Sequence, residues 1–348
     1  MGVSAFTVVM SRRPVTSILA LVALVVAGIL VATAVRSPSM HHPAAAPAAG
    51  RNAADTRAPA PAPAARPARL VAAPAGRLPA PVQDPATAAA GGGVLLIGGL
   101  DSADVSVAGI VDARPRRARS AGTLPAALHD AAAAPGGSSA YLFGGGEPSR
   151  DGILRVTPGG RATTVGRLPA PASDVAAVAA DGTFYVVGGY TGTTPLATVV
   201  AWKPGTRARV VARLPKPLRY AAVAVAGHEV VIAGGTSGVT ASRDVYAFDA
   251  RSPRVRRIGR LPRPLTHAAA ATIGGTVYVI GGRGSALGTQ TSAILAIDPA
   301  TGRSRPAGSL PRALSDAGAA ALPGSVLLAG GRDAGGAVRA EVLELKPR

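Results

Sequence analysis

Six side chains that can carry a charge or a proton stand at one fixed position of a repeat. Leu-Pro pairs recur six times, and the residue five positions after each proline is always of this kind. These residues are Asp84, Asp130, Asp174, Tyr220, His267 and Asp316. Clustered carboxylates can bind a hard cation or shift one another's pKa. One interpretation is therefore functional: the six residues form a site for a polar ligand or a cation. Because the position repeats with the chain, we favour a structural role, in which each side chain bonds a neighbouring Pro loop.

A Gly-Gly pair follows each Leu-Pro pair at a constant distance. The proline and the first glycine are 19 residues apart in all six copies, and successive copies are 44 to 49 residues apart. Between them lie a run of small residues, such as 268–272, and a continuously apolar run, such as 277–280. Gly/Asp turns separate the two runs, which favours strands over helices. Two further strands after each Gly-Gly pair complete a four-stranded antiparallel unit with two apolar faces, and radial stacking buries both faces of such sheets.

A four-stranded repeat of this length, with a double glycine ending its second strand, resembles the kelch repeat over roughly residues 69–348. The resemblance implies an all-β, six-bladed β-propeller. Two features of the family are weak, because its tyrosine survives only in three copies and Trp202 lies in a third strand instead of a fourth. The last copy ends at a third strand, and residues 69–73 resemble a fourth strand. We therefore predict that the N-terminal strand completes the last blade, which removes an open sheet edge.

The N-terminal segment predicts that the repeat region lies outside the cytoplasm. Residues 15–35 form a run of 21 residues without charge, and about 20 residues span the hydrocarbon core of a membrane. Arg12 and Arg13 precede this run, so we predict a cytoplasmic tail over 1–14 and a single membrane-spanning helix over 15–35. The alternative is a cleaved signal peptide, because Ala32-Thr33-Ala34 fits the small-x-small cleavage pattern. Residues 36–68 are rich in Pro and Ala, and we predict a disordered, semi-rigid linker.

Composition excludes several classes of function. The chain has no cysteine, which excludes disulfides, thiolate metal sites and the cysteine-crosslinked tyrosine that galactose oxidases of the kelch family need. Its formal charge is +19, but no basic run is interleaved with aromatic residues, so we predict no nucleic-acid partner. Motifs of serine hydrolases, phosphate loops and zinc peptidases are absent from the sequence. We expect no cofactor and no metal. His129 and Asp130 are adjacent, and we predict that they point to opposite faces and form no catalytic pair.

The loops after the second and fourth strands should open on one face of the propeller. We call the edge of this face the rim. The Leu-Pro loops contribute arginines to it, and the Gly-Gly loops contribute a mixed set of polar residues. Arginine is suited to bidentate binding of carboxylates and phosphates. The loop residues are Arg77, Arg167, Arg213 and Arg260 before the Leu-Pro pairs, and Asp101, Glu147, Tyr190, Arg283, Arg332 and Asp333 after the glycines.

From this rim we predict a non-catalytic binding module outside the cytoplasm whose ligand is a protein or an anionic cell-envelope glycan. The candidate ligand residues are the six repeated residues together with Glu147, Tyr190, Arg283 and Arg332. Two alternatives stay open. One is a carbohydrate-active enzyme of the sialic-acid mutarotase kind, which the resemblance allows. The other is a scaffold subunit of a membrane complex.

Overall fold

The computed structural model describes residues 68–348, and every regular element in this part of the chain is a β-strand. The all-β prediction is therefore confirmed. The predicted tail, the predicted membrane helix and the Pro/Ala-rich linker up to residue 67 lie outside the described residues. Between residues 68 and 348, no helix is long and apolar enough to cross a membrane.

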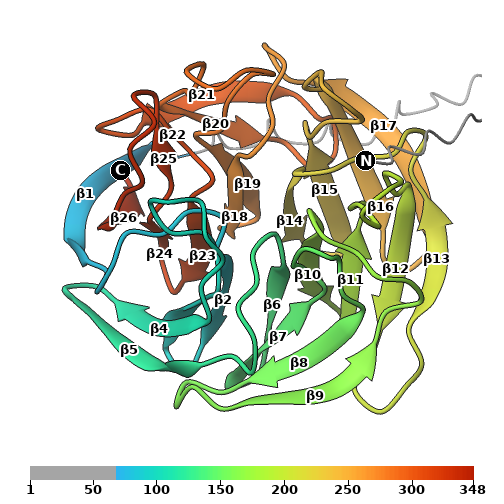
Figure 1. Ribbon diagram of the computed structural model, residues 1–348. Coiled ribbons are helices and arrows are strands. Elements are labelled where there is room, and N and C mark those ends of the chain that lie inside the picture. The colour runs from blue at the N-terminus through green and yellow to red at the C-terminus, as the bar shows by residue number, and fades with distance from the viewer. Residues whose placement is uncertain (1–67) are drawn as a thin grey trace, which may run out of the picture. The chain divides into compact units, whose positions relative to one another are not determined.

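The strands group into four-stranded antiparallel units arranged around a common axis (Figure 1). The innermost strands are β2 (Ala86–Ala90), β6 (Ala132–Gly136), β10 (Ala176–Ala180), β14 (Ala222–Ala226), β18 (Ala269–Ile273) and β23 (Gly318–Leu322). The second strands are β3 (Gly93–Ile97), β7 (Ser139–Phe143), β11 (Thr183–Val187), β15 (Glu229–Ala233), β19 (Thr276–Ile280) and β24 (Ser325–Ala329).

The two outer strands of each unit follow in the same order. The third strands are β4 (Gly109–Arg114), β8 (Gly152–Val156), β12 (Thr198–Trp202), β16 (Asp244–Asp249), β20 (Ala293–Ile297) and β26 (Glu341–Pro347). The fourth strands are β5 (Arg117–Thr123), β9 (Ala162–Arg167), β13 (Arg209–Arg213), β17 (Arg254–Arg260), β21 (Ser304–Ser309) and β1 (Leu70–Arg77). A short pair, β22 (Leu314–Ser315) with β25 (Arg332–Asp333), lies at the loop end of the last unit. We call the units blades I to VI in the order of their innermost strands.

The alanine-rich runs are the strands nearest the axis. Each innermost strand neighbours the innermost strands of the two adjacent blades, in a circuit from β2 through β6, β10, β14, β18 and β23 back to β2. Six strands meet around one axis, so only small side chains fit there. The second strands are continuously apolar because both of their faces are covered, and all five residues of β3, β11 and β24 are buried. The predicted inner and second strands are confirmed in every repeat.

The N-terminal strand completes blade VI, as predicted. β1 pairs antiparallel with β26 from Leu70↔Pro347 to Arg77↔Glu341, so strands from the two ends of the described chain form one sheet. Leu70 is only 2% exposed and belongs to the core between blades V and VI. Leu70 and Val71 also pair in parallel with β21, which joins blades V and VI into one eight-stranded sheet.

The Gly-Gly turns couple each blade to the next. In blade III, Gly188 has φ +64°, and an added Cβ would collide with the carbonyl oxygen of Leu218 in the following Leu-Pro loop. The next residue, Gly189, donates its N–H to that same carbonyl at 2.8 Å. The double glycine therefore allows a close backbone contact between blades, and it places the Gly-Gly and Leu-Pro loops on one face, as predicted.

Candidate functional site

The six repeated residues share one unusual backbone conformation. Asp84, Asp130, Asp174, Tyr220, His267 and Asp316 all have φ between 51° and 61°, a left-handed region that side chains other than Gly, Asn and Asp rarely adopt. In this conformation each amide can reach the equivalent residue of the preceding blade. Five such bonds are present: Asp84 to Asp316 (2.8 Å), Asp174 to Asp130 (2.8 Å), Tyr220 to Asp174 (3.1 Å), His267 to Tyr220 (3.2 Å) and Asp316 to His267 (3.0 Å). We call these six residues the axial ring.

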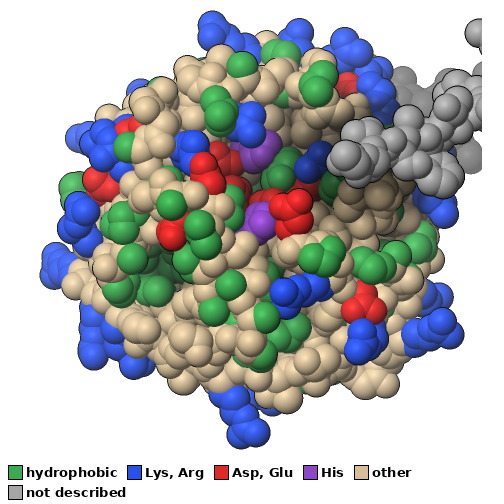
Figure 2. All heavy atoms as spheres, viewed as in Figure 1, with side chains coloured by type: hydrophobic (Ala, Val, Ile, Leu, Met, Phe, Trp, Pro, Cys, Tyr) green, Lys and Arg blue, Asp and Glu red, His purple; other side chains and the backbone are tan. Residues whose placement is uncertain are grey.

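The repeated structural role is therefore carried by the backbone, which leaves the side chains of the axial ring available for other contacts. All six line one cavity of about 150 Å³ at the mouth of the central channel, and we call it the axial cavity. Figure 2 shows histidine and acidic side chains near the centre of one face, with arginine and lysine side chains mainly around its outer edge. The six side chains of the axial ring therefore meet in one cavity.

One half of the cavity is organised around His267. The Tyr220 ring stacks on its imidazole with centroids 3.8 Å apart, and the Tyr220 hydroxyl reaches across to donate to Asp130 Oδ2 at 3.0 Å. Arg283 Nη2 donates to His267 Nε2 at 3.0 Å, which requires a lone pair on that nitrogen. Burial, assisted by Arg283 and Arg219, lowers the pKa of His267 to about 2. His267 is therefore a neutral imidazole, and its 3.9 Å approach to Asp316 is not an ion pair.

Three carboxyl groups of the cavity, those of Asp84, Asp130 and Asp316, have raised pKa values. Burial raises the pKa of Asp84 well above its usual value, and the nearby Asp316 and Asp130 raise it further. Burial and Asp174 do the same for the pKa of Asp130. The pKa of Asp316 is also raised by burial, although Ser315, which donates to Oδ2, opposes the effect. A cluster of acids that would repel an anion is thus partly neutralised.

Three arginines from consecutive blades lie next to residues of the axial ring or their neighbours. Arg219 pairs with Asp174 and lies 4.2 Å from the centre of the Tyr190 ring. Arg332 donates to Gln83 Oε1 at 2.7 Å and pairs with Asp104. Arg283 differs from both, because among residues 68–348 it makes no ion pair, and its buried Nε has no hydrogen-bond partner. A guanidinium with an unused donor beside a polar cavity can hold an external acceptor.

Of the remaining predicted rim residues, Tyr190 flanks this group through Arg219, whereas the others do not line the axial cavity. Glu147 is exposed in the loop after β7, and Tyr190 lies under Arg219 next to Ser173. The four arginines before the Leu-Pro pairs stand at the ends of fourth strands, which are the outermost strands of their blades. Arg167 pairs with Asp151 at 2.9 Å and Arg260 with Asp244 at 3.6 Å. This outer set, which comprises Arg77, Arg167, Arg213 and Arg260, therefore lies at the outer edge of the loop face and not at the axial cavity.

The prediction for His129 and Asp130 also needs correction. Their side chains approach each other, with His129 Nε2 at 3.6 Å from Asp130 Oδ2, and His129 Nδ1 lies 2.7 Å from Ser106 Oγ. Alternation of side chains between two faces holds for extended strands. Asp130 has φ 55°, so the chain turns at this residue and the alternation does not apply.

Sequence reasoning missed Arg219, although a positional signal exists. The residue before each axial-ring residue pairs with the residue after a Gly-Gly turn, as in Ser173↔Tyr190, Arg219↔Thr236 and Thr266↔Arg283. Two of these bridges hold arginines that contact axial-ring residues: Arg219 pairs with Asp174, and Arg283 donates to His267. The fourth position after each proline is therefore a second site position.

A stability measurement tests the raised carboxyl pKa values. An acid whose pKa is higher in the folded chain keeps its proton longer there, so stability declines as pH rises from the unfolded value near 4 towards the raised folded value. Each unit of elevation destabilises the fold by about 1.4 kcal/mol once the pH has passed both values, or about 2–4 °C in Tm for a domain of this size. Asn tolerates the left-handed backbone and cannot ionise. We therefore expect Asp84→Asn to raise Tm at pH 8 by about 3 °C or more, with a smaller effect at pH 4.

Asp181→Asn is the matched control, because Asp181 also has a positive φ of 48° but is exposed in a hairpin turn. Thermal melts of the three proteins from pH 4 to pH 8 make the comparison. A difference between Asp84→Asn and the unaltered chain that does not grow with pH would contradict a raised pKa at Asp84.

The fold and the site together define a class of protein. Four-stranded antiparallel blades around an axis, with Gly-Gly turns packed on the Leu-Pro loops of the next blade, are the architecture of a β-propeller. The kelch motif is recognised in residues 171–211 and 264–311, which are parts of blades III and V. The two motif matches and the fold support a kelch-repeat β-propeller family for this chain.

Solved structures support the same fold. Similar chains number 714, and they include the structure of YjhT, with a TM-score of 0.66 and 14% sequence identity. The similarity covers 78% of this chain and 98% of YjhT. At this identity the likeness concerns the fold alone. No curated protein matches the sequence.

Proposed function

We propose that residues 69–348 form a closed six-bladed propeller that acts as a non-catalytic binding module for an anionic ligand. Its axial cavity would accept a terminal carboxylate or phosphate, with Arg283 as the main contact. The observation that carries this proposal is the unused, buried Nε of Arg283 at a cavity whose acids are held towards their neutral forms. Arg219 and Arg332 are already paired with carboxylates. They therefore contribute positive charge near the ligand, and Arg283 makes the direct contact.

The size of the cavity indicates what enters it. Sites that enclose drug-sized ligands have volumes of about 300–1,000 Å³, whereas the axial cavity has about 150 Å³. It therefore suits one end group of a larger molecule whose remainder lies on the surrounding loops. An acidic glycan of the cell envelope, ending in a carboxylated sugar, fits this requirement, and a protein ligand is the other outcome that the test must allow.

Direct binding measurements test this function. We expect the full chain to bind sialic acid or glucuronic acid, and glycans that end in them, in preference to glucose. Binding should weaken as salt is raised, because a surface-accessible ionic contact is screened. A glycan array together with a pull-down from intact envelope separates a glycan ligand from a protein ligand. Equal binding of glucose and glucuronic acid would show that the protein does not recognise the carboxylate.

A second candidate is a carbohydrate-active enzyme of the sialic-acid mutarotase kind. One observation favours it: Asp130, whose pKa is raised, meets the Tyr220 hydroxyl and the His267 ring in one cavity, and a carboxyl group with a raised pKa can give or take a proton. NMR of sialic acid freshly dissolved as one anomer distinguishes the candidates. Faster interconversion with the full chain, lost in His267→Gln, would establish catalysis, and unchanged interconversion with measurable binding would establish a binding module.

The location of the propeller follows from the N-terminal segment. We propose a cytoplasmic tail over residues 1–14, a membrane anchor over 15–35, a linker over 36–68 and a propeller outside the cytoplasm over 69–348. What supports this order is the 21-residue run without charge and the arginines before it. The intact mass of the protein from its native host distinguishes an anchor from a cleaved signal peptide. A scaffold role in a membrane complex would use the same topology.

A further inference from the structure

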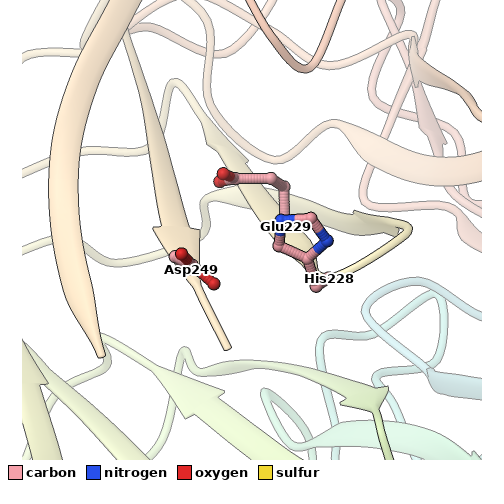
Figure 3. Close-up of side chains that lie close together, drawn as sticks. All are labelled: His228, Glu229 and Asp249. Atoms are coloured by element: carbon pink, nitrogen blue, oxygen red, sulfur yellow. The ribbon is translucent and has the colours of Figure 1, made fainter. Parts of the chain in front are cut away.

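A histidine and two carboxylates meet at the face of the propeller opposite the axial cavity. His228 lies in the turn between β14 and β15, Glu229 is the first residue of β15, and Asp249 is the last residue of β16. Figure 3 shows the three side chains at this hairpin. Each offers one ligand atom, and these three atoms all lie within 4.8 Å of one another. The cluster belongs to blade IV alone and shares no residue with the axial cavity.

The backbone holds the three residues in place. Glu229 and Asp249 are direct partners in the antiparallel pairing of β15 with β16, so their side chains stand side by side on one face. Ala250 donates its N–H to the carbonyl of His228 at 3.0 Å, which ties the turn to the end of β16. Three potential ligands are thus fixed by sheet pairing and one turn, without a long loop.

Both carboxylates have one oxygen held by a hydrogen bond, and Glu229 also has a buried oxygen without a partner in the described part of the chain. Arg256 Nη2 donates to Glu229 Oε1 at 2.9 Å, whereas Glu229 Oε2 is buried and has no partner among residues 68–348. Asp249 Oδ1 accepts the N–H of Arg251 at 2.9 Å. A buried carboxylate oxygen without a donor calls for a partner that the described residues do not supply.

We propose that His228, Glu229 and Asp249 bind one divalent transition-metal ion. Two ligand atoms at about 2.1 Å from one ion lie at most about 4.2 Å apart, so a small side-chain adjustment brings all three onto it. Glu229 would bind through Oε2, which gives that oxygen its missing partner. The hydrogen bond from Arg256 to Oε1 would then orient the carboxylate from behind, as outer-shell partners do in metal sites.

The ligand set selects the class of ion. Mg²⁺ and Ca²⁺ prefer all-oxygen coordination, whereas an imidazole with two carboxylates suits Zn²⁺, Fe²⁺, Co²⁺ or Ni²⁺. Three protein ligands leave at least one coordination position open. A metal held at this half-buried hairpin can accept a further ligand from outside. The amino-acid sequence alone does not bring these residues together, because Asp249 lies on the next strand and only the β15–β16 register places it beside Glu229.

Zinc binding to the full chain tests the site. The background is His41→Ala/His42→Ala, because this adjacent histidine pair offers a second place for the ion. In that background we expect isothermal titration with Zn²⁺ alone to give one ion per chain, and Mg²⁺ to give no binding at the same concentrations. Adding His228→Ala or Asp249→Asn should weaken Zn²⁺ binding by at least about tenfold. His129→Ala, on the opposite face, is the matched control and should leave it unchanged.

Melting curves in EDTA show whether each variant is folded. If Asp249→Asn lowers Tm in EDTA, the conclusion rests on His228→Ala alone, because His228 lies in a turn and takes no part in strand pairing. Loss of zinc binding in a folded His228→Ala chain supports the site. An unaltered affinity in His228→Ala, or no zinc binding in the starting background, overturns it. The axial cavity plays no part in either result.

Discussion

A chain that begins at Gly76 is expected to melt roughly 6–12 °C below one that begins at Ala64, because it loses most of the strand that completes blade VI. The missing residues include Leu70, which is 2% exposed in the core, and Ala75, which is 5% exposed. Burial of one leucine and several net hydrogen bonds contribute at least about 3 kcal/mol. Removing β1 also leaves β26 as an open edge, so we expect the shorter chain to aggregate more readily.

Point variants in the full chain separate the packing of β1 from its length. Leu70→Asp places a charge in the core between blades V and VI and should lower Tm strongly. Val71→Asp is the matched control, because Val71 is adjacent in β1 and 46% exposed. Differential scanning calorimetry of all four chains makes the comparison. Equal melting of the chains that begin at Ala64 and Gly76 would show that β1 does not stabilise the propeller.

Arg283→Ala is expected to weaken binding of glucuronic acid or sialic acid by about 10- to 150-fold. A hydrogen-bonded pair with a charged group contributes about 1.5–3 kcal/mol, and Arg283 is the arginine at the cavity that has no carboxylate partner among the described residues. Arg283→Lys keeps the charge but not the planar pair of donors, so it should recover only part of the affinity. Arg332→Ala should have a smaller effect, because Arg332 is held by Gln83 and Asp104.

The control for this series is Arg303→Ala. Arg303 is exposed in the turn between β20 and β21, on the face opposite the axial cavity. Titrations at two salt concentrations separate a specific contact from the general positive charge of the chain. Equal losses from Arg283→Ala and Arg303→Ala would mean that diffuse charge attracts the ligand, and the axial cavity would then have no special role.

The strands and turns could be predicted because their signals are local. A constant spacing of 19 residues between the proline and the first glycine, with a small-residue run and an apolar run between them, defines two strands of every blade. The requirement for glycine is also local, because positive φ at positions such as Gly188 excludes a side chain. The pairing of β1 with β26 followed from counting strands, since the last repeat lacked a fourth strand and the N-terminal segment resembled one.

The axial ring could be found as a set of residues, but its roles could not be read from the sequence. The repeated position suggested one role for all six side chains, whereas the structure assigns that role to the backbone amides and their left-handed conformation. That same conformation brings His129 and Asp130 together, against the expectation from strand alternation. The positive φ of a single Asp or Tyr cannot be predicted from its residue type.

The sequence by itself determined the repeat, the strands, the turn chemistry and the strand that completes the last blade, because these depend on interactions between residues that recur at fixed spacing. Only the tertiary structure decided which side chains meet. Tyr220 and Asp130 are in contact although they belong to blades IV and II. Arg219 lies at the site, whereas the arginines of the fourth strands lie at the outer edge. Glu229 lies beside Asp249 because of the register between their strands. These distances depend on how the blades close around the axis and on the register of neighbouring strands, and residue spacing along the chain does not encode either one.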